Sequence, residues 1–142
     1  MEIRKLGPGE KGPAMDLAWR IFQMFQAPDD PPEGAEAFHA YIMDPEIREG
    51  LTGYGAFQEE TLTGVLAVRD NHISLFFVDS SQHKRGIGRA LFHHFLADRG
   101  PGTVSVNSSP YAVEVYRHLG FRPTAPEQMT DGIRYTPMRY SQ

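Results

Sequence analysis

A glycine-rich turn between a predicted strand and a predicted helix constrains this chain more than any other feature. Apolar residues fill positions 73–78 almost completely, as in a buried strand, and a helical pattern runs from Ile87 to Leu96. Gly86 and Gly88 lie between them, directly after a basic run. Glycine lets the backbone approach a ligand closely, and the first turn of a helix presents unpaired N–H groups. The segment therefore predicts an anion site, such as a pyrophosphate cradle.

The identity of the phosphate ligand is narrowed by what this segment lacks. It contains no Gly-x-x-x-x-Gly-Lys-Ser/Thr pattern, so it is not a Walker loop. Only two of the three glycines of a dinucleotide fingerprint are present, and no acidic residue ends a following strand at the expected distance. A Gly-x-Gly is also common in plain turns, so both interpretations fit the segment taken alone.

A second strand and helix follow in the sequence. Residues 103–106 alternate in polarity as a short strand does. Ser109 suits the N-cap of a helix, and Pro110 suits its first position. Gly120 then suits the residue just after the helix. The sequence therefore predicts a helix over residues 110–119.

Together these segments resemble the GNAT superfamily of acyl-CoA-dependent N-acyltransferases. The run His-Lys-Arg-Gly-Ile-Gly at 83–88 is similar to its pyrophosphate-binding motif, Gln/Arg-x-x-Gly-x-Gly/Ala, with His83 in the first position. Ala112-x-x-x-Tyr116-x-x-x-Gly120-Phe121 is similar to its second cofactor motif. The resemblance covers roughly residues 54–121. It implies an α/β fold (an α+β mixed sheet) with about seven strands and four helices on both faces.

The resemblance implies acetyl-CoA as co-substrate and a set of residues that hold it. The family's Asn usually lies three residues before the Ala of the second motif, where this chain has Ser109. Asn107 lies two residues further back, and we favour it over Ser109 for the pantetheine arm. The expected cofactor-binding residues are Phe77, Val78, His83, Lys84, Arg85, Gly86, Ile87, Gly88, Arg89, Asn107, Ser109 and Tyr116.

The implied reaction is direct transfer of an acetyl group to a primary amine through a tetrahedral intermediate. The chain has no cysteine, so no cysteine can carry the acyl group. The resemblance assigns the oxyanion donor to a backbone N–H at the bulged end of strand 73–78, about Val78. It assigns protonation of the leaving thiolate to Tyr116. The competing interpretation makes Tyr116 a helix-face tyrosine that packs on the sheet.

The general base is not apparent in the sequence, and a water relay is an equal alternative. The resemblance places the amine acceptor, a small molecule or a peptide, where the first two helices meet the last hairpin. Acids of the loop at 27–34 would then form a rim for a cationic substrate. The candidate bases are His72, Ser74, Asp79, Asp29, Asp30 and Glu33.

Composition favours a small cytoplasmic enzyme and disfavours several other classes. The 142 residues predict one domain over 1–142, and the net charge of −4 argues against nucleic acid as a partner. Without cysteine there is neither a disulfide framework nor a thiolate zinc site, and the histidines lack metal-ligand spacing, so we expect no metal. No apolar stretch reaches the length of a signal core or a membrane span. Relatives often pair, which makes a homodimer an expectation.

Two further interpretations of the function stay open: a catalytically silent acyl-CoA-binding module, and an unrelated nucleotide-binding domain.

The remaining secondary-structure elements follow from periodicity and turn residues. A loop is expected at 27–34, a hairpin turn at 59–62, and a turn into the last strand at 127–135. Expected strands cover residues 2–6, 54–58, 63–69, 73–78, 103–106, 121–123 and 132–138, and expected helices cover 10–26, 35–43, 87 to about 98, and 110–119.

Overall fold

The computed structural model describes residues 1–79, 86–99 and 102–141. Within them it has eight strands and five α-helices, and the strand order is β1-β2-β3-β4-β5-β8-β6, with β7 paired to β8. The strands are β1 (Glu2–Lys5), β2 (Thr52–Gln58), β3 (Thr61–Arg69), β4 (His72–Val78), β5 (Val104–Ser108), β6 (Arg122–Pro123), β7 (Gln128–Thr130) and β8 (Ile133–Tyr140). The helices are α1 (Lys11–Phe25), α2 (Pro32–Met43), α3 (Pro45–Gly50), α4 (Ile87–Asp98) and α5 (Val113–Leu119).

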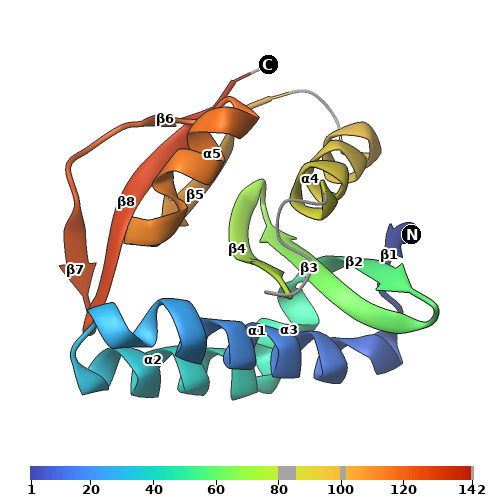
Figure 1. Cartoon of the computed structure of the whole chain (residues 1–142), viewed down its shortest axis with the longest axis horizontal. Helices are drawn as coiled ribbons and strands as arrows, with labels where there is room; N and C mark the ends of the chain where they lie inside the picture. The colour runs from blue at the N-terminus through green and yellow to red at the C-terminus, as the bar shows by residue number, and fades with distance from the viewer. Residues whose placement is uncertain (80–85, 100–101, 142) are drawn as a thin grey trace.

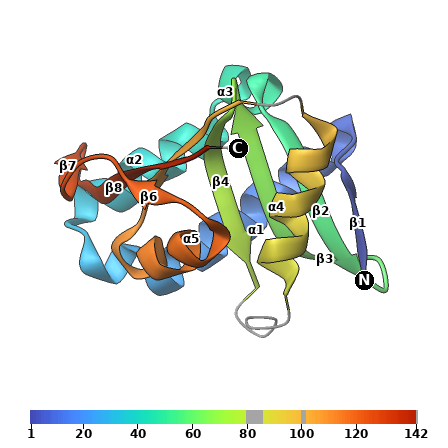
Figure 2. The ribbon, with the colours of Figure 1, turned by 90° about the horizontal axis from the view of Figure 1, so that it is seen from above.

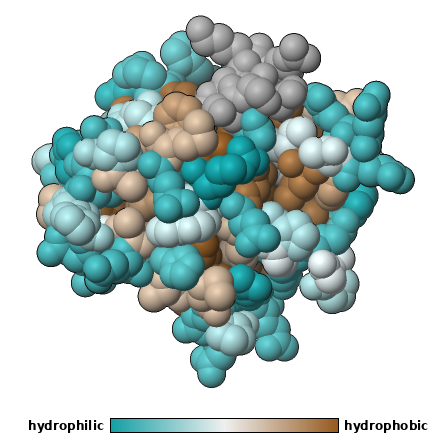
Figure 3. Space-filling model, turned by 60° about the horizontal axis from the view of Figure 1, so that its bottom comes forward, coloured by the Kyte–Doolittle hydropathy of each residue, from teal (hydrophilic) through white to brown (hydrophobic). Residues whose placement is uncertain are grey.

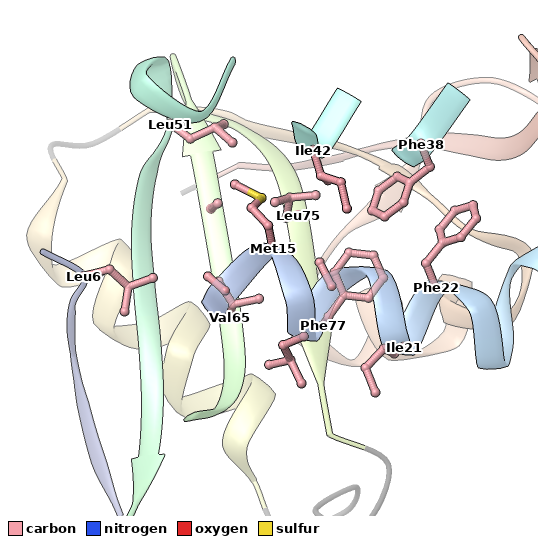
Figure 4. Packing of buried hydrophobic residues seen from close by; sticks show 14 residues of the cluster. Leu6, Met15, Ile21, Phe22, Phe38, Ile42, Leu51, Val65, Leu75 and Phe77 are labelled. Atoms are coloured by element: carbon pink, nitrogen blue, oxygen red, sulfur yellow. The ribbon is translucent and has the colours of Figure 1, made fainter. Parts of the chain in front are cut away.

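Helices cover both faces of the sheet, which confirms the predicted mixed α/β architecture. In Figure 1, α1 and α2 lie below the strands, and α4 and α5 lie above them. Each face has its own apolar core. Met15, Ile21 and Phe22 of α1 pack with Val65 and Leu75 of the sheet on one face (Figure 4). The other core gathers α4, α5 and side chains of β3, β4, β5 and β8.

Three hairpins turn on two residues with positive φ, the signature of type I′ turns. They are Glu59-Glu60 (49° and 70°), Asp70-Asn71 (51° and 62°) and Asp131-Gly132 (53° and 79°). The predicted four-residue turn at 59–62 is therefore wrong, since pairing starts again at Thr61. Two glutamates give no turn signal, because type I′ turns favour Asn, Asp and Gly.

The structure contains two elements that the sequence does not predict, helix α3 and strand β7. Helix α3 follows α2 after one residue, capped by Asp44, whose carboxylate accepts the Glu46 N–H at 2.9 Å. The expected loop is shorter than 27–34, because α2 starts at Pro32. The expected turn at 127–135 contains strand β7, whose exposed residues have no apolar pattern of their own and depend on pairing with β8.

The sheet opens between β4 and β5. Among the residues that the structure describes, these parallel strands pair only at His72↔Ser105 and Ile73↔Val106. Beyond these pairs they diverge, and Figure 2 shows β3 and β4 on one side with β8 and α5 on the other. We call the space between the diverging strands the wedge.

Figure 3 views the molecule with its α1 and α2 side brought forward. Hydrophobic residues reach this surface in areas separated by hydrophilic ones. No helix in the described parts of the chain is long and apolar enough to cross a membrane.

Candidate active site

Two cavities meet at the wedge. Both are lined by Phe76, Phe77, Tyr111, Ala112 and Tyr116. The wedge cavity, of about 370 Å³, is also lined by Phe22, Gln26, Ala37, Phe38, Tyr41, His72, Ile73, Ser74, Val106, Asn107, Ser109, Thr130, Asp131, Ile133 and Tyr135. The glycine-turn cavity, of about 540 Å³, is also lined by Ile21, Val78, Gly86, Ile87, Gly88, Arg89, Val115, His118 and Leu119.

The start of α4 presents backbone to the glycine-turn cavity. Gly86 has a φ of 78° and caps the helix, which explains a glycine at that position. A Cβ added at Gly88 would make only ordinary contacts, 3.6 Å to Phe76 and 3.9 Å to Val78. Packing within the protein therefore does not require glycine at 88, whereas a ligand lying close to the backbone would favour one. The predicted residues His83, Lys84 and Arg85 lie outside the described residues.

Tyr116 lies between the two cavities. It is 6% exposed, and its ring meets Phe76 edge-on at 5.9 Å and Phe121 at 5.3 Å between centroids. Burial raises the pKa of its hydroxyl, which therefore keeps its proton at neutral pH. The site thus combines the packing contacts of a core tyrosine with the protonation state of a proton donor.

The backbone of β4 turns two N–H groups toward the wedge. The Asp79 N–H donates to the Thr63 carbonyl at 2.8 Å, so Gly64 and Val78 form a non-hydrogen-bonded pair of the β3–β4 ladder. The N–H of Val78, and that of Phe76 two residues earlier, therefore point away from β3. Phe76 lines both cavities, whereas Val78 lines only the glycine-turn cavity.

The β-bulge lies in the middle of β4 and not at its end. Ala67 pairs with Leu75 and Val68 pairs with Ile73, which leaves Ser74 as the extra residue. The expectation of a bulge near Val78 is wrong in this respect. The bulge reverses the side-chain alternation: Ile73 packs with the α4/α5 core, and Leu75 packs with the α1/α2 core.

The structure places the two candidates for the pantetheine arm close together, at the end of β5. Asn107 is exposed near the end of β5, and Ser109 follows the strand by one residue. Both line the wedge cavity.

The fold places some of the candidate bases in the wedge cavity and others outside it. His72 and Ser74 line the wedge cavity. The His72 Nδ1 lies 2.8 Å from the Ser105 Oγ, and burial lowers the pKa of the imidazole, which is therefore neutral at pH 7. Asp79 lines neither cavity and forms an ion pair with Arg20 at 2.9 Å.

The structure separates the acids of the predicted rim. Asp29, Asp30 and Glu33 do not line the wedge cavity, but Glu33 lines a neighbouring cavity that shares Ala37 and Asp131 with it. Asp30 Oδ1 instead accepts the Arg134 N–H at 3.2 Å, and burial raises the pKa of this carboxyl. The acid that reaches the cavity is Asp131, in the turn between β7 and β8.

Sequence reasoning missed two aromatic residues that line both cavities. In the sequence, Phe76 is only one of several residues in an apolar strand. Tyr111, 42% exposed, meets Phe25 of α1 at 5.6 Å between ring centroids and so bridges α1 and the segment before α5. No motif signals either residue, because their role follows from the divergence of β4 and β5. No group of three or more metal-ligating side chains occurs in the part of the chain that the structure describes.

Comparison with known families assigns the chain to a class. Residues 26–142 match the acetyltransferase (GNAT) domain family, and the chain belongs to that family. Comparison with curated proteins finds no match.

Solved structures agree with this fold. The chain is similar to a GCN5-related N-acetyltransferase from Rhodopseudomonas palustris, with 18% identity, a TM-score of 0.80, and coverage of 99% of this chain and 95% of that one. It is also similar to the PaiA N-acetyltransferase from Thermoplasma acidophilum in complex with coenzyme A. That match has 18% identity and a TM-score of 0.72, and it covers 99% of this chain and 98% of the other. A third similar structure is an aminoglycoside 6′-N-acetyltransferase complexed with coenzyme A. It has 15% identity and a TM-score of 0.62, and the match covers 98% of this chain and 96% of that one.

Proposed function

We propose that this protein transfers an acetyl group from acetyl-CoA to a primary amine. The observation that carries the proposal is the junction of the two cavities in the wedge. A thioester entering from the glycine-turn cavity and an amine entering from the wedge cavity would meet beside Phe76 and Tyr116. Two of the structures with this fold contain coenzyme A, which supports the choice of cofactor.

The residues of the glycine turn suit the cofactor's pyrophosphate. The first turn of α4 offers backbone N–H groups, Gly88 leaves room for close approach, and Arg89 adds positive charge. His83, Lys84 and Arg85 complete the motif in the sequence. Asn107 and Ser109 remain the candidates for the pantetheine arm from the sequence; both line the wedge cavity, and neither lines the glycine-turn cavity.

Acetyl transfer requires a base, an oxyanion donor and an acid. We assign the base to His72, because it is neutral and lines the wedge cavity. Its imidazole takes a proton from the ammonium, and the free amine then attacks the thioester carbon. The developing oxyanion accepts a hydrogen bond from an N–H of β4. Phe76 suits this role better than Val78, because it lines both cavities.

The Tyr116 hydroxyl then gives its proton to the sulfur as the carbon–sulfur bond breaks. Burial raises the pKa of this hydroxyl, so it is protonated at neutral pH when the thiolate forms. The products are the acetylated amine and free CoA thiol. The positively charged nitrogen formed by the attack gives up its extra proton, through water, to the phenolate, and His72 releases the proton that it took to solvent.

The test is a calorimetric titration with acetyl-CoA of the unmodified protein, Gly88→Val and Gly88→Ala. We expect one saturable site, weakened at least tenfold by valine, which fills the space beside the helix start. Alanine is the matched control, because its Cβ makes only ordinary contacts and the family motif accepts Ala there. Absence of binding by the unmodified protein would overturn the proposal. Binding without release of CoA thiol with any amine would favour the silent binding module.

A further inference from the structure

Among the described residues that line both cavities, Tyr111 is the one with an exposed side chain. Phe77 belongs to the α1/α2 core and Tyr116 to the α4/α5 core, and Phe76 and Ala112 pack against the latter. Tyr111 is part of neither core, and 42% of its surface is exposed. Core packing therefore explains the other four side chains at the junction, but it does not explain a large ring at position 111.

The backbone and a neighbouring ring hold Tyr111 in this position. It lies in η4 (Pro110–Ala112), a single 3-10 turn between β5 and α5, in which the Ala112 N–H donates to the Ser109 carbonyl at 3.1 Å. Its ring packs against Phe25 of α1, with centroids 5.6 Å apart. Burial raises the pKa of its hydroxyl although much of the side chain is exposed, so the hydroxyl end is the enclosed part. The ring therefore reaches from the surface into the junction of the cavities.

A ring in this place restricts the acyl group of the donor. In the proposed reaction the thioester carbon lies at the junction, and the rest of the acyl group extends from it, away from the CoA sulfur. An acetyl group adds one methyl group there. Each further methylene needs space among side chains that are already close together, and a packed site gives way poorly to added volume. Because the other rings at the junction are held by the cores, Tyr111 is the ring whose removal makes room without loss of core packing.

We propose that Tyr111 is a specificity-determining residue that limits the acyl donor to acetyl-CoA. This inference rests on the proposed acetyltransferase function and concerns the donor at that same site. An alanine at position 111 opens the junction to longer acyl groups, whereas a phenylalanine keeps it closed.

Calorimetric titrations with acetyl-CoA, butyryl-CoA and free CoA test the proposal without any acceptor. We expect the unmodified protein to bind acetyl-CoA at least tenfold more tightly than butyryl-CoA, whose acyl chain is longer by two methylenes. Tyr111→Ala should reduce this ratio of the two Kd values to about threefold or less, because the space left by the ring admits the longer chain.

Two further variants and the third ligand are the controls. Tyr111→Phe keeps the ring and should keep the preference for acetyl-CoA. Met24→Ala removes an exposed side chain of α1 that lines neither cavity, and it should keep the preference too. Free CoA has no acyl group, so all four proteins should bind it alike, which also shows that each variant is folded.

The possible failures of this experiment are distinct. An unchanged ratio in Tyr111→Ala, or equal affinities of the unmodified protein for acetyl-CoA and butyryl-CoA, would overturn the role of Tyr111 and leave the acetyltransferase function intact. A loss of affinity for free CoA in Tyr111→Ala would assign the ring to cofactor binding and so contradict the proposal. If the unmodified protein bound neither acetyl-CoA nor free CoA, the proposed function itself would be wrong.

Discussion

Tyr116 shows how one side chain can serve the core and the chemistry together. Its ring packs against Phe76 and Phe121, and burial keeps its hydroxyl protonated. We expect Tyr116→Phe to lower kcat about 10- to 100-fold, because a thiolate is a good leaving group and its protonation is only part of the barrier. Affinity for acetyl-CoA, measured by calorimetry, should not change, since the ring remains. Full turnover in this variant would assign Tyr116 to packing alone.

The role assigned to His72 predicts how kcat depends on pH. Burial lowers the pKa of the imidazole below its ordinary value of 6.5, so the base is unprotonated at neutral pH. We expect kcat to rise with pH through an inflection below 6.5 and then to level off. His72→Ala should lower kcat about 10²- to 10⁴-fold and abolish this inflection.

Ser105 provides the control for His72, because its Oγ lies 2.8 Å from the ring Nδ1. Ser105→Ala should lower kcat less than the loss of His72 and retain an inflection, since the ring is still present. An unchanged profile in His72→Ala would move the role of base to a water relay.

The sequence predicts residues with a local signature and misses those that depend on distant strands. The turn at Gly86 can be predicted because a strand, a glycine and a helix follow one another in the sequence, and Gly86 has a φ of 78° in the structure. The position of Phe76 depends on the bulge at Ser74 and on the divergence of β5, neither of which a run of apolar residues encodes. Tyr111 likewise gains its place from a contact with α1.

Among the secondary-structure elements, strong periodicity makes the best predictions. Helix α1 and strands β2 to β4 lie close to their expected bounds, because each buries a regular apolar set. Helix α3 has a local signal in the sequence, an Asp cap followed by Pro45. Strand β7 carries none, since its three residues are exposed and gain their structure from β8.

The connection between β1 and α1 is held by an ion pair whose effect depends on pH. The Arg4 guanidinium donates to both Glu10 carboxylate oxygens at 2.7 Å and 2.6 Å, and the Gly7 N–H donates to Oε1 at 2.8 Å. These bonds lower the pKa of Glu10 from 4.5 to about 2. A depressed carboxyl pKa stabilises the fold above 4.5, and this stabilisation is lost as the pH falls toward 2.

Glu10→Gln should therefore have a lower Tm than the unmodified protein above pH 5, by a small amount because the pair is partly solvated. The difference should shrink as the pH falls from 4.5 to 2. Asp16→Asn, at an exposed acid on α1, is the control and should show no such trend. A Tm difference independent of pH would show that the ion pair does not control this connection.

The whole molecule is two half-sheets that share little pairing. Strands β1 to β4 form one antiparallel set, β5, β6 and β8 form another, and two residue pairs join β4 to β5. The small number of pairs between β4 and β5 creates the wedge, because fully paired strands would leave no room between them. It also means that a ligand seated in the wedge would contact both halves and strengthen their connection.

We expect acetyl-CoA at 100 times its Kd to stabilise the protein by about 2.7 kcal/mol. For a chain of this length, that corresponds to a rise in Tm of roughly 10 °C. Hydrogen exchange should slow in both β4 and β5, because the ligand bridges strands that are paired only at His72 and Ile73. Gly88→Val should lose the shift, and Gly88→Ala should keep it. Protection confined to α4 would show that the cofactor binds at the glycine turn without entering the wedge, and the junction of the two cavities would then not be the reaction centre.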